Sequence, residues 1–128
     1  MAELTDYAEC KILNTLRNVA WTAFNVYVAL FTSATDDAGG GIEVIGGGYA
    51  RQLVGLSEAI GAGGLTSNAA DIIFPTATAD WGTVTHVAIM DAATGGNMIM
   101  HSPLDASKAI ATGDTFKINA TELVCTIA

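Results

Sequence analysis

The stretch that most constrains the fold is residues 74–104, which read FPTATADWGTVTHVAIMDAATGGNMIMHSPL. Two runs rich in β-forming residues, 83–89 and 97–101, flank a tight Thr-Gly-Gly turn at residues 94–96. Two such runs around a Gly-Gly turn predict an antiparallel β-hairpin. We therefore expect the rest of the chain to pack against this hairpin.

Other short β-prone runs recur along the chain, with turn signals about every 8 to 12 residues. This pattern predicts a mainly β fold, an antiparallel β-sandwich of about seven to nine short strands, rather than a βαβ fold. The run 26–33 is almost entirely apolar, so we expect a central strand or one buried on both faces. The other expected strands are residues 42–45, 49–57, 69–74, 108–111, 115–120 and 122–127. Loops are expected at residues 34–48 and 58–67, and a turn at 103–106.

The best helix candidate lies near the N-terminus, at about residues 5–18. Thr5 or Asp6 can cap its start, and Asp6 and Glu9 have capping-box spacing. Asn18 is the expected stop. An apolar stripe at helical spacing can lie across a sheet or against a neighbouring subunit. This stripe consists of Ala8, Ile12, Leu13 and Leu16.

The length of 128 residues fits a single domain, 1–128, without an internal repeat or a dividing linker. Charged residues make up 14% of the chain, which is low against a usual share of about a quarter. A small domain with so little charge has either a large core or a surface hidden against a partner. We favour the second explanation, which predicts assembly.

The charge balance excludes several partners. Thirteen acidic and five basic residues give a formal net charge of −8. Nucleic-acid phosphates and anionic membranes repel such a surface, so neither is an expected partner.

The N-terminal residues lack the basic and apolar regions of a secretory signal, and no apolar stretch reaches the roughly 18 residues of a membrane span.

No cofactor is expected from the glycine-rich loop. Gly41 and Gly46 have the spacing of two P-loop glycines, but Gly47 and Gly48 stand where Lys and Ser or Thr are required.

No metal site is predicted either. His86 and His101 lie on the two arms of the hairpin, but two histidines do not complete a structural zinc site. Asp91 is a third candidate ligand, although it sits at the turn end of one arm. The aspartates fit turn chemistry better than calcium binding. These aspartates are Asp36, Asp37, Asp80, Asp91, Asp105 and Asp114.

The two cysteines, Cys10 and Cys125, lie far apart and have no metal-ligand spacing. We expect both to be small buried apolar residues rather than a disulfide.

No serine is singled out by a nucleophile motif or a fixed base, so we expect no enzymatic activity.

Three residues are candidates for an interface. Trp81, in Asp80-Trp81-Gly82, fits the core or a subunit interface better than a sugar-stacking platform. Tyr49 and Arg51 fall on one face of the expected strand 49–57, and both residue types are enriched in interface hot spots. They can equally stack on each other at the surface.

The chain also resembles a known family. The segment PTATADWGTVTHVAIMDAATGGNM at residues 75–98 is similar to small phage virion proteins, often labelled tail-fibre proteins, which include capsid cement (decoration) proteins. The segments VYVALFTS at 26–33, GGGYARQ at 46–52 and TGDT at 112–115 fit the same family, and the resemblance runs from about residue 4 to the end.

The resemblance implies a structural virion protein, made in the host cytoplasm. Its cement branch implies a β-sandwich that binds the major capsid protein on the outer capsid surface as a homotrimer and stabilises the head. Multivalent attachment of this kind raises avidity. The alternatives are a tail-fibre or tailspike component and a carbohydrate-binding β-sandwich module.

Overall fold

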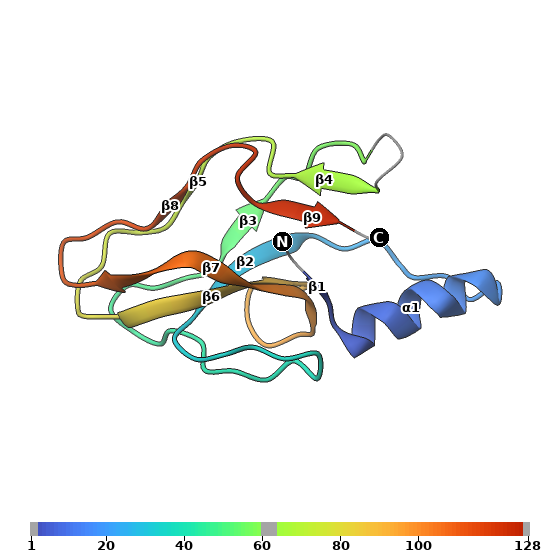
Figure 1. Ribbon diagram of the computed structural model, residues 1–128, viewed down its shortest axis with the longest axis horizontal. Helices are drawn as coiled ribbons and strands as arrows, with labels where there is room; N and C mark the ends of the chain where they lie inside the picture. Colours follow the sequence, from blue (N-terminus) through green and yellow to red (C-terminus); the bar gives the residue numbers. More distant parts are fainter. Residues whose placement is uncertain (1–2, 60–63, 127–128) are drawn as a thin grey trace.

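The computed structural model describes residues 3–59 and 64–126 (Figure 1). Within these residues the chain forms nine strands, paired antiparallel, and one helix. This arrangement confirms the predicted mainly β fold with a single N-terminal helix.

A five-stranded antiparallel sheet, in the order β1-β7-β6-β2-β3, forms the main layer (Figure 1). Its centre is the predicted hairpin, whose arms pair along most of their length. The strands are β1 (Glu3–Leu4), β2 (Val26–Phe31), β3 (Gln52–Val54), β6 (Gly82–Met90) and β7 (Met98–Ile110).

Two short strand pairs form a second layer over one face of this sheet. One pair joins β4 (Leu65–Ser67) to β9 (Val124–Thr126), and the other joins β5 (Ile72–Ile73) to β8 (Lys117–Ile118). One buried apolar cluster contains side chains of both layers, as expected of a sandwich. It includes Val28, Leu30, Val87 and Ile89 from the main sheet and Phe74, Phe116, Ile118 and Leu123 from the second layer.

The strand β2 is buried on both faces, as its apolar sequence predicted. Val28 and Leu30 face the sandwich core, whereas Ala29 and Phe31 belong to a separate buried cluster on the opposite face. The first part of the loop 34–48 runs along that opposite face, where Gly39 approaches Met98 and Gly41 approaches Phe31, seen as the teal trace below the sheet in Figure 1. Further along the loop, Val44 returns to the sandwich core. The sequence predicted this burial because period-2 alternation is missing from the run.

The predicted turn at residues 103–106 is wrong, because β7 continues through Pro103 to Ile110. Pro103 lies opposite His86, and the register between β6 and β7 shifts between Val84 and His86. On its other side β7 pairs with β1 only at His101 and Met100, so Pro103 needs no backbone N–H on that edge.

The helix α1 (Asp6–Leu16) matches the predicted position. Thr5 is its N-cap, and the Thr5 hydroxyl accepts a hydrogen bond from the Ala8 N–H, so the Asp6–Glu9 capping box was wrong. Asn18 has a φ of 65°, a left-handed conformation that ends the helix as expected.

Several predicted strands are shorter than expected. Within 42–45 only Glu43 forms a bridge, to Phe31, and the strand expected at 49–57 is reduced to β3 and an isolated bridge between Leu56 and Asn68. The expected strand 108–111 is the end of β7, and the expected loop 58–67 ends in β4. Residues 60–63 of that loop lie outside the described residues.

The expectation that both cysteines are buried was half wrong. Both carry free thiols; Cys125 is buried, but Cys10 is exposed on α1. Burial raises the pKa of the Cys125 thiol to about 11.

Candidate functional site

The structure brings the three predicted interface residues together: Tyr49 and Arg51 both bind Glu43, in the loop 34–48, and Trp81 contacts Tyr49. The Arg51 guanidinium forms a bidentate pair with the Glu43 carboxylate: Nε lies 2.8 Å from Oε2, and an η nitrogen lies 2.8 Å from Oε1. The Arg51 side chain is only 7% exposed, and that of Glu43 is 23% exposed. Paired charges with this geometry and burial form a strong, specific contact.

Arg51 also holds the hairpin turn in place. Its other η nitrogen donates to the carbonyl oxygens of Ala92 and Gly95, each at 2.8 Å. A single guanidinium therefore joins the loop 34–48 to the turn between β6 and β7. Its planar array of donors suits this role better than the point charge of a lysine.

Tyr49 joins the same cluster through both its hydroxyl and its ring. The hydroxyl donates to Glu43 Oε2 at 2.6 Å and accepts from the Leu30 backbone N–H at 3.1 Å. The ring stacks on Phe74 at 6.2 Å and meets Trp81 edge-on at 5.5 Å. Burial and the hydrogen bond to Glu43 raise the pKa of Tyr49.

Trp81 is 5% exposed and lies in the core. Its indole N–H donates to the Gly47 carbonyl at 2.8 Å. Gly47 has a φ of 59°, and a Cβ at this position would lie 2.9 Å from the indole ring. The close approach of Trp81 to the loop therefore requires glycine at this position.

Two opposing effects act on the Glu43 carboxyl. Burial raises its pKa, but the hydrogen bonds from Arg51 and Tyr49 and the Arg51 charge together outweigh burial, so the pKa is lowered. The ionised carboxylate is thus the form that this cluster stabilises.

The sequence did not identify Glu43. Its only signal was an isolated acid within the apolar run Ile42-Glu43-Val44-Ile45, between two glycine triplets. Tyr49 and Arg51 lie just before β3 rather than within a strand, although both side chains point to the same side, toward Glu43. Their contacts here are internal, and a role for them at an interface stays a prediction.

The buried position of Trp81 and the stacking of Tyr49 on Phe74 also bear on sugar binding. A sugar-stacking platform needs an exposed aromatic face, and the Trp81 ring does not offer one.

A second region, the exposed part of α1 with the segment that follows it, has the opposite character. Ala8 is the only buried residue of α1, and the Thr5 hydroxyl anchors the start of the helix by donating to the Met98 carbonyl at 2.6 Å. Beyond this anchor the helix extends away from the sandwich (Figure 1). The predicted stripe is therefore divided: Ala8 is buried, Ile12 is half-buried, and Leu13 and Leu16 are exposed. We call the following set the helix patch: Leu13 (60% exposed), Leu16 (82%), Val19 (50%) and Phe24 (37%).

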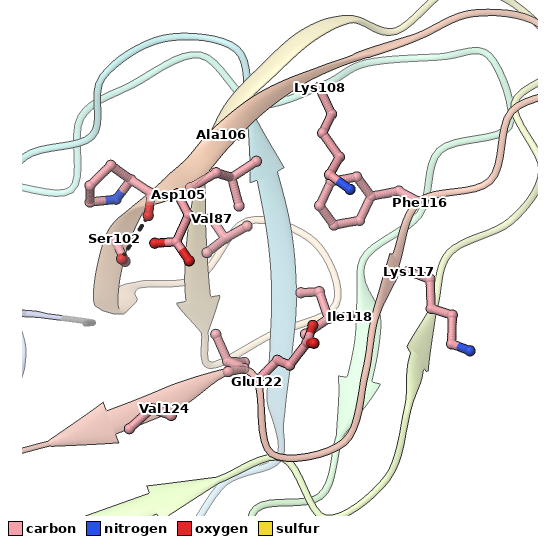
Figure 2. A pocket seen from close by; sticks show the side chains of 13 residues that line it. Val87, Ser102, Asp105, Ala106, Lys108, Phe116, Lys117, Ile118, Glu122 and Val124 are labelled. Atoms are coloured by element: carbon pink, nitrogen blue, oxygen red, sulfur yellow. Dashed lines mark hydrogen bonds between the residues drawn. The ribbon is translucent and has the colours of Figure 1, made fainter.

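An open groove of about 560 Å³ lies between β7 and the segment that carries β8 and the start of β9 (Figure 2). Buried apolar side chains form its inner wall, and exposed charged side chains stand at its opening. The wall includes Val87, Phe116, Ile118 and Leu123, and the charged residues at the opening are Asp105, Lys108 and Glu122. The Lys117 side chain points away from the groove (Figure 2) and pairs with Asp71 at 3.3 Å.

The two histidines of the hairpin are not directly opposite each other. His86 lies opposite Pro103, whereas His101 lies opposite Ala88. His86 Nδ1 is 2.8 Å from the Thr85 hydroxyl. Asp91 accepts the Asn97 N–H at 2.7 Å and thus closes the hairpin turn, so it is engaged apart from both histidines.

Among the described residues, no helix is long and apolar enough to cross a membrane.

No curated protein matches the chain. A family model described as "Podophage GP4 fiber I protein gp80" matches residues 3–126. Because this match covers nearly all of the chain, the protein belongs to the podophage GP4 fiber I protein gp80 family and is a structural protein of the bacteriophage virion.

Proposed function

We propose that this protein is a non-enzymatic subunit of a phage fibre, which associates with other copies of itself, as a homotrimer, through the helix patch. The observation that carries the proposal is the exposure of four large apolar side chains on one helix and its continuation. Single exposed apolar residues are ordinary, whereas several on one helix and the segment that follows it favour an interaction surface.

The chain exposes more surface than a compact monomer of its mass. The chain exposes 7118 Å², whereas a compact monomer of 13.1 kDa exposes roughly 6,400 Å². The excess of roughly 700 Å² fits a chain in which α1 extends away from the sandwich (Figure 1). The fibre assignment itself rests on the description of the family.

A second candidate is a cement protein on the outer capsid surface, bound to the major capsid protein. The net charge of −8 favours it, because an acidic outer surface and apolar subunit contacts suit a decoration protein. In both candidates a trimer gains avidity from several simultaneous contacts.

The test of self-association is the molar mass of the purified full chain by light scattering, compared with that of the Leu13→Ser/Leu16→Ser variant. We expect a trimer for the unchanged chain and at least tenfold weaker association for the variant. Leu65→Ser, which changes a 46% exposed leucine on β4, is the matched control and should remain trimeric. A monomeric unchanged chain, or a variant that stays fully trimeric, would contradict the proposal.

The location is tested by co-sedimentation of the purified protein with isolated tails and, separately, with isolated heads, each lacking the protein. Saturable binding to tails supports the fibre role. Saturable binding to heads supports the cement role, and the number of copies bound per capsid subunit then reports the symmetry of the binding sites.

A further inference from the structure

A cluster of three potential metal ligands lies outside the regions discussed above. It consists of Glu3 on β1, Asp37 in the loop 34–48 and His101 on β7, and one ligand atom of each lies within 4.8 Å of the others. These residues lie 34 and 64 positions apart along the chain (3 to 37, and 37 to 101). The fold, rather than local sequence, brings them together.

Backbone pairing fixes the position of each ligand. Glu3 and His101 are directly opposite in the antiparallel β1–β7 ladder, so their side chains share one face. Asp37 is held beside them because its carbonyl accepts the Asp6 N–H at 2.9 Å. The cluster is therefore built on paired strands and a bonded loop.

His101 is oriented as a metal ligand would be. Its side chain is 9% exposed, and its Nε2 faces Asp37 Oδ1 at 2.9 Å. Its other ring nitrogen, Nδ1, is 2.9 Å from the Thr35 hydroxyl. Metal-binding histidines commonly donate their second ring N–H to such an oxygen, which leaves the first nitrogen free to bind.

The charges also favour a cation at this position. Two carboxylates converge here, and neither pairs with Lys or Arg in the described part of the chain. Three donors bound to one Zn²⁺ at about 2 Å lie roughly 3–3.5 Å apart. The exposed Glu3 and Asp37 side chains reach that spacing by small rotations, whereas His101 stays fixed.

The geometry points to a divalent transition-metal site formed by the Glu3 and Asp37 carboxylates and His101 Nε2, with water completing the coordination. One imidazole and two carboxylates suit Zn²⁺ and related ions, whereas Ca²⁺ and Mg²⁺ prefer oxygen ligands alone. When the ion binds, Nδ1 carries the ring proton and donates to Thr35, and any proton on Nε2 is released to solvent. The bound ion joins β1, the loop 34–48 and β7.

The test is calorimetric titration of ZnCl₂ into the full chain, without a polyhistidine tag and after treatment with chelator. We expect one site per chain, a rise in melting temperature with Zn²⁺, and no such rise with CaCl₂. Co²⁺ titration adds a visible absorption spectrum that reports the ligand geometry. Because thiols are common zinc ligands and Cys10 is exposed, a Cys10→Ser variant is titrated in parallel; it should bind Zn²⁺ equally well if Cys10 is not a ligand.

His101→Gln should weaken Zn²⁺ binding at least tenfold, whereas His86→Gln, on the neighbouring strand, should leave it unchanged. Glu3→Gln changes an exposed side chain and should also weaken binding at least tenfold, so the test remains decisive if His101→Gln does not fold. Unchanged affinity in Glu3→Gln, loss of binding in His86→Gln or Cys10→Ser, equal stabilisation by Ca²⁺, or no binding at millimolar Zn²⁺ would overturn the proposal.

Discussion

The Glu43–Arg51 cluster and the helix patch differ in a way that residue type alone would not suggest. The cluster contains Tyr49, Arg51 and Trp81, residue types that are frequent at interface hot spots, yet the Arg51 and Trp81 side chains are buried in contacts within the chain. The helix patch consists of apolar residues, which are usually buried in a core, yet its side chains are exposed, Leu16 to 82%.

The difference separates two uses of surface chemistry. In the cluster, polar groups satisfy one another and fix the loop 34–48 against the hairpin. On the helix patch, the Phe24 ring packs on Trp21 at 5.2 Å, but Leu13, Leu16 and Val19 are each at least half exposed, so burying them requires another molecule. The comparison therefore predicts that changes in the cluster alter stability, while changes on the helix patch alter association.

The largest effect is expected for Arg51→Ala. It leaves the Glu43 carboxylate without its guanidinium and frees two carbonyls of the hairpin turn. Breaking a largely buried pair costs about 3 kcal/mol of unfolding free energy. Urea denaturation measures this loss.

Lys117→Ala is the control for Arg51→Ala, because Lys117 pairs with Asp71 at 3.3 Å while both side chains are nearly half exposed. We expect a loss below about 0.5 kcal/mol from it. Equal losses from the two variants would mean that Arg51 is not a specific support of this loop.

Gly47→Ala should have the next largest effect, about 2 kcal/mol, because it combines a left-handed φ with overpacking against the Trp81 ring. Gly46→Ala is the matched control. Gly46 has a similar φ of 75°, but a Cβ added there would meet no atom within 4 Å, so only the backbone cost of about 1 kcal/mol is expected. Thermal unfolding of both variants measures the difference, and indistinguishable melting temperatures would refute tight packing at Gly47.

A smaller effect concerns pH. Because the folded pKa of Glu43 lies below its ordinary value of 4.5, the carboxylate stabilises the fold above pH 4.5. This contribution is lost as the pH falls through the lower, folded pKa. We expect the unfolding free energy of the unchanged chain to fall more steeply below pH 4.5 than that of Glu43→Gln, measured by urea titrations across this range. Parallel pH profiles would show that Glu43 is not the group responsible.

The smallest effect on stability is expected on the helix patch. Leu13→Ser/Leu16→Ser should change the unfolding free energy of the monomer by less than about 0.5 kcal/mol, because both side chains are exposed. Denaturation at protein concentrations where the chain is monomeric tests this. A loss as large as that of Arg51→Ala would abolish the contrast between the two regions.

The sequence alone determined the elements that depend on local chemistry. The hairpin followed from β-forming runs around Gly95 and Gly96, the helix ends from Thr5 and Asn18, and the central strand from the apolar run at β2. Each of these signals lies within a few residues of the structure that it specifies, so periodicity, capping and turn preferences were enough.

Only the tertiary structure decided which side chains meet. Arg51 binds the carbonyls of Ala92 and Gly95, and carbonyl oxygens are present at every residue, so no residue type marks them in advance. Pro103 stays within β7 because its neighbour β1 is too short to need its missing N–H. His101 meets Glu3 and Asp37 through strand register and loop placement. Such contacts depend on how distant segments pack, and this packing is set by the burial of the whole core rather than by any local pattern.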